Sequence, residues 1–385
     1  MPRGSTATTP DEVRQAAHEI GYPVLIRPSY VLGGWGMEIL SNDKQLEAYM
    51  EEAFLAPDRP LLIDEYLGNA IELDVDAVCD GEEVLVGAIM EHLEEAGIHS
   101  GDSTCFIPPQ NIPEHVLAEV EDWTRKIGIE LGIRGCYNIQ FAIRDEVLHV
   151  LEVNPRGSRT FPFVAKATGV PLARIAARLA LGEKLSELNV PEPQTDAVCV
   201  KAPVFPFIKL RGLDPAPGPE MKSTGEVMGS HARPAAAYLK ARLATELPVP
   251  VEGGVYITVK DGDKLAIIDE ARRLQEMGFT LYATRGTAHV LRDVGGLDVQ
   301  TCYRIAERRS PDALDLMRQG KIHLVINTPR STGGAVLDGN MMRRLAVELN
   351  IPFVTTMAGA HMEVEAIDEA MKGMPEPRLL EIGSL

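Results

Sequence analysis

The chain has 385 residues, of which 45% are hydrophobic and 24% charged, a composition typical of folded domains and a length that allows two or three of them. Its net charge of −18 and pI of about 5.0 argue against a nucleic-acid or membrane surface, so any bound anion needs a local cluster of positive groups. The five cysteines are scattered, and neither a membrane span nor a signal peptide is visible. These features indicate a cytoplasmic protein.

The first predicted element is a helix over residues 10–20, because Thr9 and Glu12 have the spacing of a capping box. A strand over 22–31 and a return strand over 37–40 follow, joined by a glycine-rich turn. Further strands are expected over 61–67, 71–80, 83–93, 137–144 and 147–154, with a helix over 113–132. This first part is therefore predicted to be α+β with mostly antiparallel pairing.

The second part of the chain has a different pattern. Residues 203–250 are rich in proline and glycine, which predicts irregular structure followed by a linker. After Gly254, apolar strands alternate with helices in the manner of a parallel α/β domain. We therefore predict a first domain over 1–190, an irregular extension and linker over 191–252, and a second domain over 253–385.

The strand over 147–154 ends in polar residues. Glu152 and Asn154 are two residues apart and must share one face of the strand, and the neighbouring strand offers Gln140. Their hard oxygen atoms suit Mg²⁺ or Mn²⁺, and Arg156 and Arg159 follow directly, as phosphoryl transfer requires. The alternative, equally open from this segment alone, is an exposed strand end at which Glu152 pairs with Arg156.

Two other segments are weaker candidates for binding. Gly33, Gly34 and Gly36 would let backbone amides approach phosphate oxygens, although a plain hairpin is the simpler interpretation. Arg27, a charged residue in an apolar strand, strengthens the phosphate interpretation because it needs a partner. A polar loop rich in histidine and carboxylates spans residues 92–103, and it is either solvated or part of a site.

Taken in order, these segments resemble the second, C-terminal synthetase unit of the large subunit of carbamoyl-phosphate synthetase, an ATP-grasp domain. The matching segments are RPSYVLGG, DVDAVCDGE, MEHLEEAGIHSGDS, NIQFA, LEVNPRGSRTFPFVAKATGVPLA and GPEMKSTGEVMG. Residues 253–385 resemble the methylglyoxal-synthase-like allosteric domain of that subunit, through ATRGTA, LVINTP and PFVTTMAGA. The resemblance covers the whole chain and implies an ATP-grasp domain, partly truncated at its N-terminus, followed by a parallel α/β domain.

The resemblance implies ATP-dependent phosphorylation of carbamate to carbamoyl phosphate, within glutamine-dependent synthesis that feeds arginine and pyrimidine biosynthesis. It implies two Mg²⁺ or Mn²⁺ ions, with Glu152 bridging them. The implied metal ligands are Gln140, Glu152 and Asn154; the implied catalytic groups are Arg156, Arg159 and His99; the implied ATP-binding residues are Arg27, Gly33, Gly34, Glu65, Leu67, Glu72, His99 and Ser100. The implied partners are the N-terminal synthetase unit and the glutamine amidotransferase small subunit, and a homo-oligomer stays open.

A small anionic effector is expected in the second domain. Thr284, Gly286 and Thr287 lie between a strand end and a helix start, where free amides and the helix dipole attract phosphate, and Asn327 ends another strand candidate. The resemblance suggests UMP or IMP, with ornithine nearby in some relatives and with Arg304 assisting. The alternative is a capped helix without a ligand.

Some features depart from the family pattern. Trp35 stands where the family usually has an arginine, Pro329 stands where some effector sites have a hydroxyl, and the chain begins inside the ATP-grasp fold. A catalytically weak fragment that binds nucleotide and effector is therefore the alternative hypothesis, and on that basis we expect little turnover from this chain alone. A ligase for another carboxylate substrate is a third hypothesis, disfavoured by HSGDS and GPEMKSTGEVMG.

Overall fold

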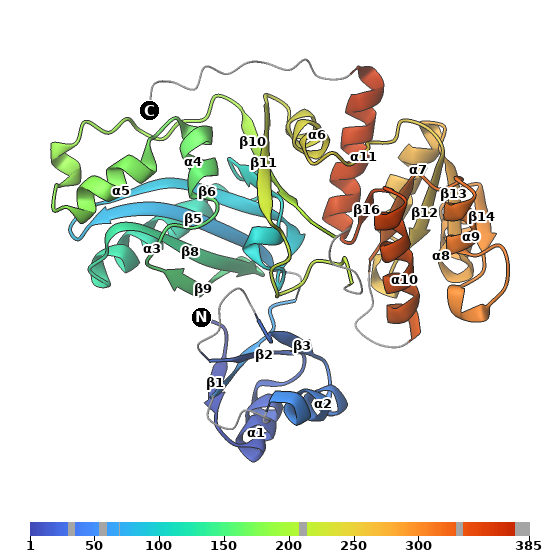
Figure 1. Cartoon of the computed structure of the whole chain (residues 1–385), viewed down its shortest axis with the longest axis horizontal. Coiled ribbons are helices and arrows are strands. Elements are labelled where there is room, and N and C mark those ends of the chain that lie inside the picture. The colour runs from blue at the N-terminus through green and yellow to red at the C-terminus, as the bar shows by residue number, and fades with distance from the viewer. Residues whose placement is uncertain (30–34, 54–59, 69, 208–213, 329–333, 374–385) are drawn as a thin grey trace. The chain divides into compact units, whose positions relative to one another are not determined.

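The computed structural model describes residues 1–29, 35–53, 60–68, 70–207, 214–328 and 334–373, and they form two compact units (Figure 1). The first unit contains Met1–Lys201 and Pro217–Ser223. The second contains Ala202–Ala216 and the described chain from Thr224 onward. In the described part of the chain, no helix has the length and apolar character needed to cross a membrane.

The first unit begins with a small four-stranded antiparallel sheet in the order β1-β4-β2-β3. Its elements are β1 (Gly4–Ala7), α1 (Pro10–Ile20), β2 (Val24–Pro28), β3 (Glu38–Leu40), α2 (Asp43–Ala53) and β4 (Leu61–Glu65). The predicted capping box is confirmed, because the Thr9 side chain accepts from the Glu12 backbone and the Glu12 side chain accepts from the Thr9 backbone. The predicted pairing of the strands on either side of the glycine-rich turn is also confirmed.

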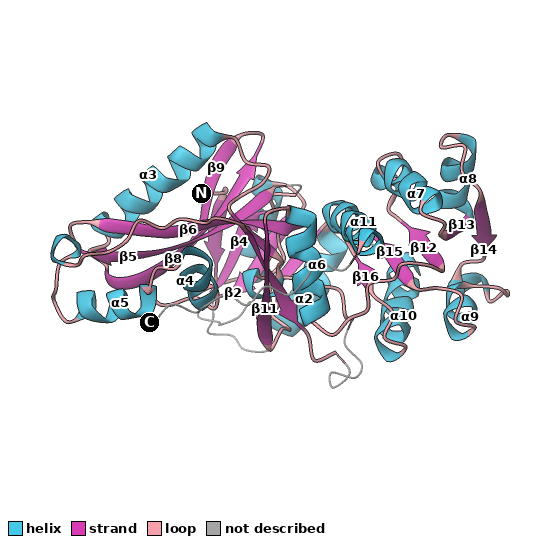
Figure 2. Cartoon of the chain, turned by 90° about the horizontal axis from the view of Figure 1, so that it is seen from above, coloured by secondary structure: helices cyan, strands magenta, loops and turns pink. Residues whose placement is uncertain are grey.

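A larger antiparallel sheet follows, in which the strands of this unit have the order β10-β7-β6-β5-β8-β9. The strands are β5 (Ile71–Asp80), β6 (Val84–Glu95), β7 (Cys105–Ile107), β8 (Arg134–Arg144), β9 (Val147–Asn154) and β10 (Val198–Val204). The helices are α3 (Glu114–Glu130), α4 (Phe161–Thr168) and α5 (Leu172–Ala180), with short 3₁₀ turns at Ser100–Asp102 and Leu185–Glu187. Figure 2 shows α3 and α5 on opposite sides of this sheet. Asp145 and Glu146 join β8 to β9 with φ angles of 53° and 62°, the left-handed conformation of a tight hairpin.

Strand β5 is the central strand of the site, and both of its faces are buried. Leu73, Val75 and Ala77 pack with apolar residues of α3 on one face. Because side chains alternate along a strand, the carboxylates of Glu72, Asp74 and Asp76 share the other face. The large sheet therefore has an apolar face and, along this strand, a buried polar one.

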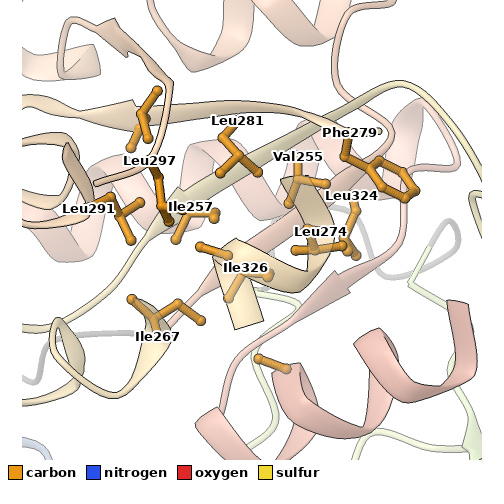
Figure 3. Packing of buried hydrophobic residues seen from close by; sticks show 14 of the residues in the cluster. Val255, Ile257, Ile267, Leu274, Phe279, Leu281, Leu291, Leu297, Leu324 and Ile326 are labelled. Atoms are coloured by element: carbon orange, nitrogen blue, oxygen red, sulfur yellow. The ribbon is translucent and has the colours of Figure 1, made fainter. Parts of the chain in front are cut away.

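The second unit contains a five-stranded parallel sheet in the order β14-β13-β12-β15-β16. Its strands are β11 (Gly225–His231), β12 (Gly254–Thr258), β13 (Thr280–Thr284), β14 (Val299–Cys302), β15 (Leu324–Asn327) and β16 (Phe353–Val354). Its helices are α6 (Pro234–Ala244), α7 (Ile267–Glu276), α8 (Arg285–Asp293), α9 (Ala313–Arg318), α10 (Gly334–Glu348) and α11 (Met357–Lys372), with 3₁₀ turns at Asp261–Asp263 and Ile305–Glu307. Figure 3 shows its apolar core, where Ile257, Leu281 and Ile326 of adjacent strands meet Leu274 and Leu291 of helices α7 and α8.

The structure confirms the predicted alternation of strands and helices and corrects several details. Strand β14 and helix α9 were not predicted. The segment predicted to be irregular contains β11 and α6; Pro234 occupies the first turn of α6, where its missing N–H costs nothing. The domain boundaries given above stay a prediction.

Candidate functional site

A pocket of about 240 Å³ in the first unit gathers most of the residues that the sequence singled out. It is lined by residues of β2, β4, β5, β8 and β9 and of the loop after β6. The predicted residues in its lining are Arg27, Glu65, Leu67, Glu72, His99, Ser100, Gln140, Glu152, Asn154 and Arg156. Gly33 and Gly34, which were predicted to hold phosphate, lie outside the described residues, and Trp35 beside them is 59% exposed.

The three predicted metal ligands lie together at the β8–β9 hairpin. Gln140 and Glu152 are partners in the ladder, and Asn154 Nδ2 donates to Glu152 Oε1 over 2.8 Å, which confirms that Glu152 and Asn154 share a face. Gln140 Nε2 donates to Ser100 Oγ over 2.6 Å, and this bond turns the amide nitrogen toward the serine. One carboxylate and two amides beside a pocket form an oxygen-rich donor set that suits a hard cation.

Arg27 in β2 brings an incompletely bonded positive group into the pocket. Its Nε is buried and has no hydrogen-bond partner among the described residues. The carboxylate of Asp64 is 3.6 Å away, beyond hydrogen-bond distance, and burial raises the pKa of that carboxyl. Because a buried guanidinium N–H needs an acceptor, this orphaned donor indicates a place for an anionic ligand.

At another part of the pocket, Glu65 accepts charge-assisted hydrogen bonds from two arginines. Arg144 Nη2 lies 2.8 Å from Oε1, and Arg3 Nε lies 3.0 Å from Oε2. The hydrogen bond from Arg144 and then that from Arg3 lower the pKa of Glu65. Sequence reasoning missed both arginines, since they lie 62 and 79 residues away along the chain. The Glu65 side chain is thus held in place in the pocket lining, to which the buried Leu67 also belongs.

A buried histidine, His92, lies between two carboxylates, one of which, Glu72, lines the pocket. His92 Nε2 is 3.2 Å from Asp74 Oδ2, and His92 Nδ1 is 3.5 Å from Glu72 Oε2. Burial by itself would lower the pKa of His92, but the Cys105 sulfur and the carboxylates of Asp74 and Glu72 raise it well above its ordinary value. Glu72 also accepts the backbone N–H of Gly97 at 3.0 Å, so the carboxylate is held from two sides.

The pKa of His99 is shifted in the opposite direction to that of His92. Its Nδ1 accepts the N–H of Gly101 at 3.0 Å, and its backbone N–H donates to Gly218 at 2.8 Å. Burial lowers the pKa of His99, so the ring is neutral at pH 7 and Nε2 carries the proton. Asp102 accepts the N–H groups of Lys222 and Ser223, which fixes the segment 217–223 next to this histidine.

The two predicted arginines after β9 differ in position. Arg156 lines the pocket, and its Nη2 donates to Asn154 Oδ1 over 3.3 Å. Arg159 is not among the lining residues, and its Nη1 donates to the backbone oxygen of Ser223 over 3.3 Å. The structure therefore brings Arg156 into the predicted site and leaves Arg159 on the loop that borders it.

A separate pocket of about 330 Å³ lies within the second unit. All five residues predicted for an effector line it: Thr284, Gly286, Thr287, Arg304 and Asn327. Lys260, Lys264 and Arg285, which sequence reasoning missed, line it as well. Both lysines follow β12, and the rule that ligands bind at the carboxyl ends of parallel strands could have identified them. Pro329 lies outside the described residues.

The walls of this second pocket are fixed by buried contacts. Arg343 is 2% exposed and donates from Nη1 to Asn327 Oδ1, and its Nε donates to Asp214 Oδ1 over 2.9 Å. Thr284 stands at the N-cap of α8, but its side chain makes no capping hydrogen bond. The start of α8 therefore offers backbone N–H groups beside several cationic side chains, an arrangement that suits a phosphate.

We predict that His92 and His99 titrate on opposite sides of 6.5, their ordinary pKa. The raised pKa of His92 means that its contribution to stability is complete below pH 6.5 and is lost as the pH rises through the folded-state value. The lowered pKa of His99 has the opposite sign, with stability lost as the pH falls below 6.5. Ring ¹⁵N NMR titration of the whole chain measures both values, and Asp74→Asn should lower that of His92. A His99 that titrates above His92 would contradict this assignment.

Comparison with known families agrees with this geometry. Residues 1–188 match the family described as carbamoyl-phosphate synthase L chain, ATP binding domain, and residues 266–355 match the MGS-like domain. A solved structure of N5-carboxyaminoimidazole synthase from Aspergillus clavatus, in complex with ADP and an aminoimidazole ribonucleotide, superimposes with a TM-score of 0.50 at 14% identity. It covers 64% of this chain and 68% of that one, and shows a shared fold alone.

Curated relatives match nearly the whole chain. The chain is 50% identical over 382 residues to the carbamoyl phosphate synthase large chain, C-terminal section, of Methanocaldococcus jannaschii, covering 96% of this chain and 62% of that protein. It is 49% identical over 368 residues to the large chain of Methanothermobacter thermautotrophicus, covering 94% of this chain and 34% of that protein. It thus spans less than two thirds of the first relative and about a third of the second. The chain belongs to the carbamoyl phosphate synthase large-chain family and corresponds to its C-terminal section, an ATP-grasp domain followed by an MGS-like domain.

Proposed function

We propose that this chain phosphorylates carbamate with ATP to give carbamoyl phosphate, as the C-terminal part of a glutamine-dependent carbamoyl-phosphate synthase. The observation that carries the proposal is the single pocket that collects Arg27, Gln140, Glu152, Asn154 and Arg156. An acidic chain that concentrates arginines and oxygen ligands at one site is equipped to offset repulsion between a nucleotide and an anionic substrate. The family membership supports the same reaction.

Each residue has a proposed role in that pocket. Gln140, Glu152 and Asn154 would hold two Mg²⁺ or Mn²⁺ ions, which would neutralise charge on the phosphates. Arg27 binds a phosphate oxygen through its orphaned Nε–H, and Arg156 stabilises the transferring phosphoryl group. Two further assignments are proposed from position: Glu65 to Leu67 face the adenine, and Glu72 binds the ribose. Neutral His99 and Ser100 contact phosphate or carbamate as hydrogen-bond donors.

The surrounding biology is proposed on the same basis. The chain would receive carbamate from an N-terminal synthetase unit, whose ammonia comes from a glutamine amidotransferase small subunit. The pocket of the second unit would bind UMP or IMP, with ornithine as another regulator. The product would enter arginine and pyrimidine biosynthesis in the cytoplasm.

The test of the reaction is phosphoryl transfer in reverse. If the proposed function is correct, the whole chain forms ATP from carbamoyl phosphate, Mg²⁺ and ADP, because the residues required for this half-reaction line one pocket. ATP formation would then overturn the expectation, made from the sequence, of little turnover by this chain alone. Arg156→Ala should reduce the rate about a hundredfold or more. Arg134→Ala, which changes an exposed arginine at the start of β8, is the control. If no ATP forms above background, the weak-fragment hypothesis is correct and the proposal is wrong.

The metal assignment has its own test. Glu152→Gln keeps the shape of the side chain and removes its charge, so Mg²⁺-dependent ATP binding should be lost in titration calorimetry. Glu130→Gln changes an exposed carboxylate at the end of α3 and should leave the affinity unchanged. Equal Mg²⁺-ATP affinity in the Glu152 variant and the wild type would remove this residue from the metal site.

The effector pocket is tested with UMP and IMP. Each nucleotide is titrated into the whole chain, with ¹⁵N amide shifts of residues 284–287 as the readout. Thr284→Val removes a hydroxyl from the pocket lining and should weaken binding about tenfold, in line with the loss of a hydrogen bond to a charged group. Thr280→Val, at the exposed start of the same strand, is the control. Absence of shifts at saturating nucleotide would show that α8 is a capped helix without this ligand.

A further inference from the structure

Asp76 is a fully buried carboxylate that has no assigned role in the proposed reaction. It lies in the middle of β5 with no exposed surface, on the same face as Glu72 and Asp74. In the part of the chain that the structure describes, no ion pair involves this carboxylate. An unpaired buried carboxylate is costly, so it persists only where several hydrogen bonds satisfy it.

The hydrogen bonds to Asp76 come mainly from one loop. Ser158 Oγ lies 2.7 Å from Oδ1 and 2.9 Å from Oδ2, and Thr160 Oγ1 donates to Oδ2 over 2.7 Å. Asn138 Nδ2 adds a third donor, 3.0 Å from Oδ1. Ser158 and Thr160 flank Arg159, on the same loop that carries Arg156.

The Thr160 side chain donates to Asp76 and does not cap its own helix. It occupies the N-cap of α4, where a threonine hydroxyl usually accepts a backbone N–H of its own helix. Here the side chain makes no capping bond and donates to Asp76 instead. Burial raises the pKa of Asp76 to about 6, so at pH 7.5 the group is a carboxylate and its hydrogen bonds are charge-assisted.

We propose that Asp76 is a positioning residue that, through Ser158 and Thr160, holds the loop 155–160 so that Arg156 faces the substrate pocket and Arg159 stays fixed at its border. The inference rests on the proposed function, since it names what orients the arginines of that site. Phosphoryl transfer depends on charges that are already in place before the substrate binds. Anchoring the loop by its hydroxyl groups provides this order.

The choice of hydroxyl donors has a physical consequence. A carboxylate that paired directly with Arg159 would neutralise the charge required for the substrate. Asp76 bonds to the residues on both sides of Arg159, so the loop is fixed and both guanidinium groups keep their charge. Asp80 makes a useful contrast on the same strand face, because it accepts backbone N–H groups of Glu82, Glu83 and Leu185 at the far end.

The experiment compares whole-chain variants that differ by one hydrogen-bond donor or acceptor. Thr160→Val removes the hydroxyl at nearly constant shape, Thr160→Ser retains it, and Asp76→Asn replaces an acceptor oxygen. Asp80→Asn is the matched control, a buried aspartate of the same strand. The first readout is the ¹H–¹⁵N NOE of the Arg159 Nε–H, assigned with Arg159→Lys. The second is the affinity for carbamoyl phosphate and for Mg²⁺-ADP.

We expect Thr160→Val and Asp76→Asn to lower the Arg159 NOE and weaken carbamoyl phosphate binding about tenfold, with Mg²⁺-ADP affinity within twofold. Thr160→Ser should restore both, and Asp80→Asn should change neither. An unchanged Arg159 NOE in Thr160→Val, or in Asp76→Asn if the valine variant does not fold, overturns the proposal. If the wild type binds neither ligand, the proposed function is wrong, and the NOE still decides whether Asp76 orders the loop.

Discussion

A carboxylate buried in a sheet has to be satisfied by groups that the rest of the chain brings to it. Strand β5 places Glu72, Asp74 and Asp76 on one buried face, and desolvating each charge costs several kcal/mol before any partner is counted. The partners come from β6, β8 and the loop after β9, which are therefore held against this strand by more than apolar packing. Glu72 of this row also lines the pocket of the first unit.

Two histidines near this row have pKa values shifted in opposite directions. The pKa of His92, which lies between two carboxylates, is raised well above its ordinary value, and the pKa of His99, which is half-buried in the pocket lining and accepts a backbone N–H at Nδ1, is lowered. A charged histidine behind the site offsets the carboxylates, and a neutral one within it can donate from Nε2 without adding charge. Two residues of the same type thus serve different purposes because their surroundings differ.

In the second unit, the pocket lies at one edge of the parallel sheet. The strands of this sheet are parallel, so their carboxyl ends all lie at one edge. The loops after β12 and β13 and the end of β15 therefore meet at that edge. Arg343 donates a hydrogen bond to Asn327, and cationic side chains line the same pocket as the start of α8. The carboxylates of Glu307 and Asp338 line the same pocket, and Arg304 forms an ion pair with Asp338.

The sequence alone predicted several features that depend on residues close together in the chain, although it missed local elements such as β14, α9, β11 and α6. The capping box of α1, the β8–β9 hairpin and the alternation along β9 depend on spacings of a few residues, and they place Glu152, Asn154 and Gln140 together. The tertiary structure decided which distant residues meet: Arg3 and Arg144 at Glu65, the lysines of the second pocket, and Ser158 and Thr160 at Asp76 across 82 and 84 residues. It also separated Arg156 from Arg159, which the sequence presents as equivalent. Local periodicity specifies the face on which a side chain lies, but strand order and loop path determine what it faces.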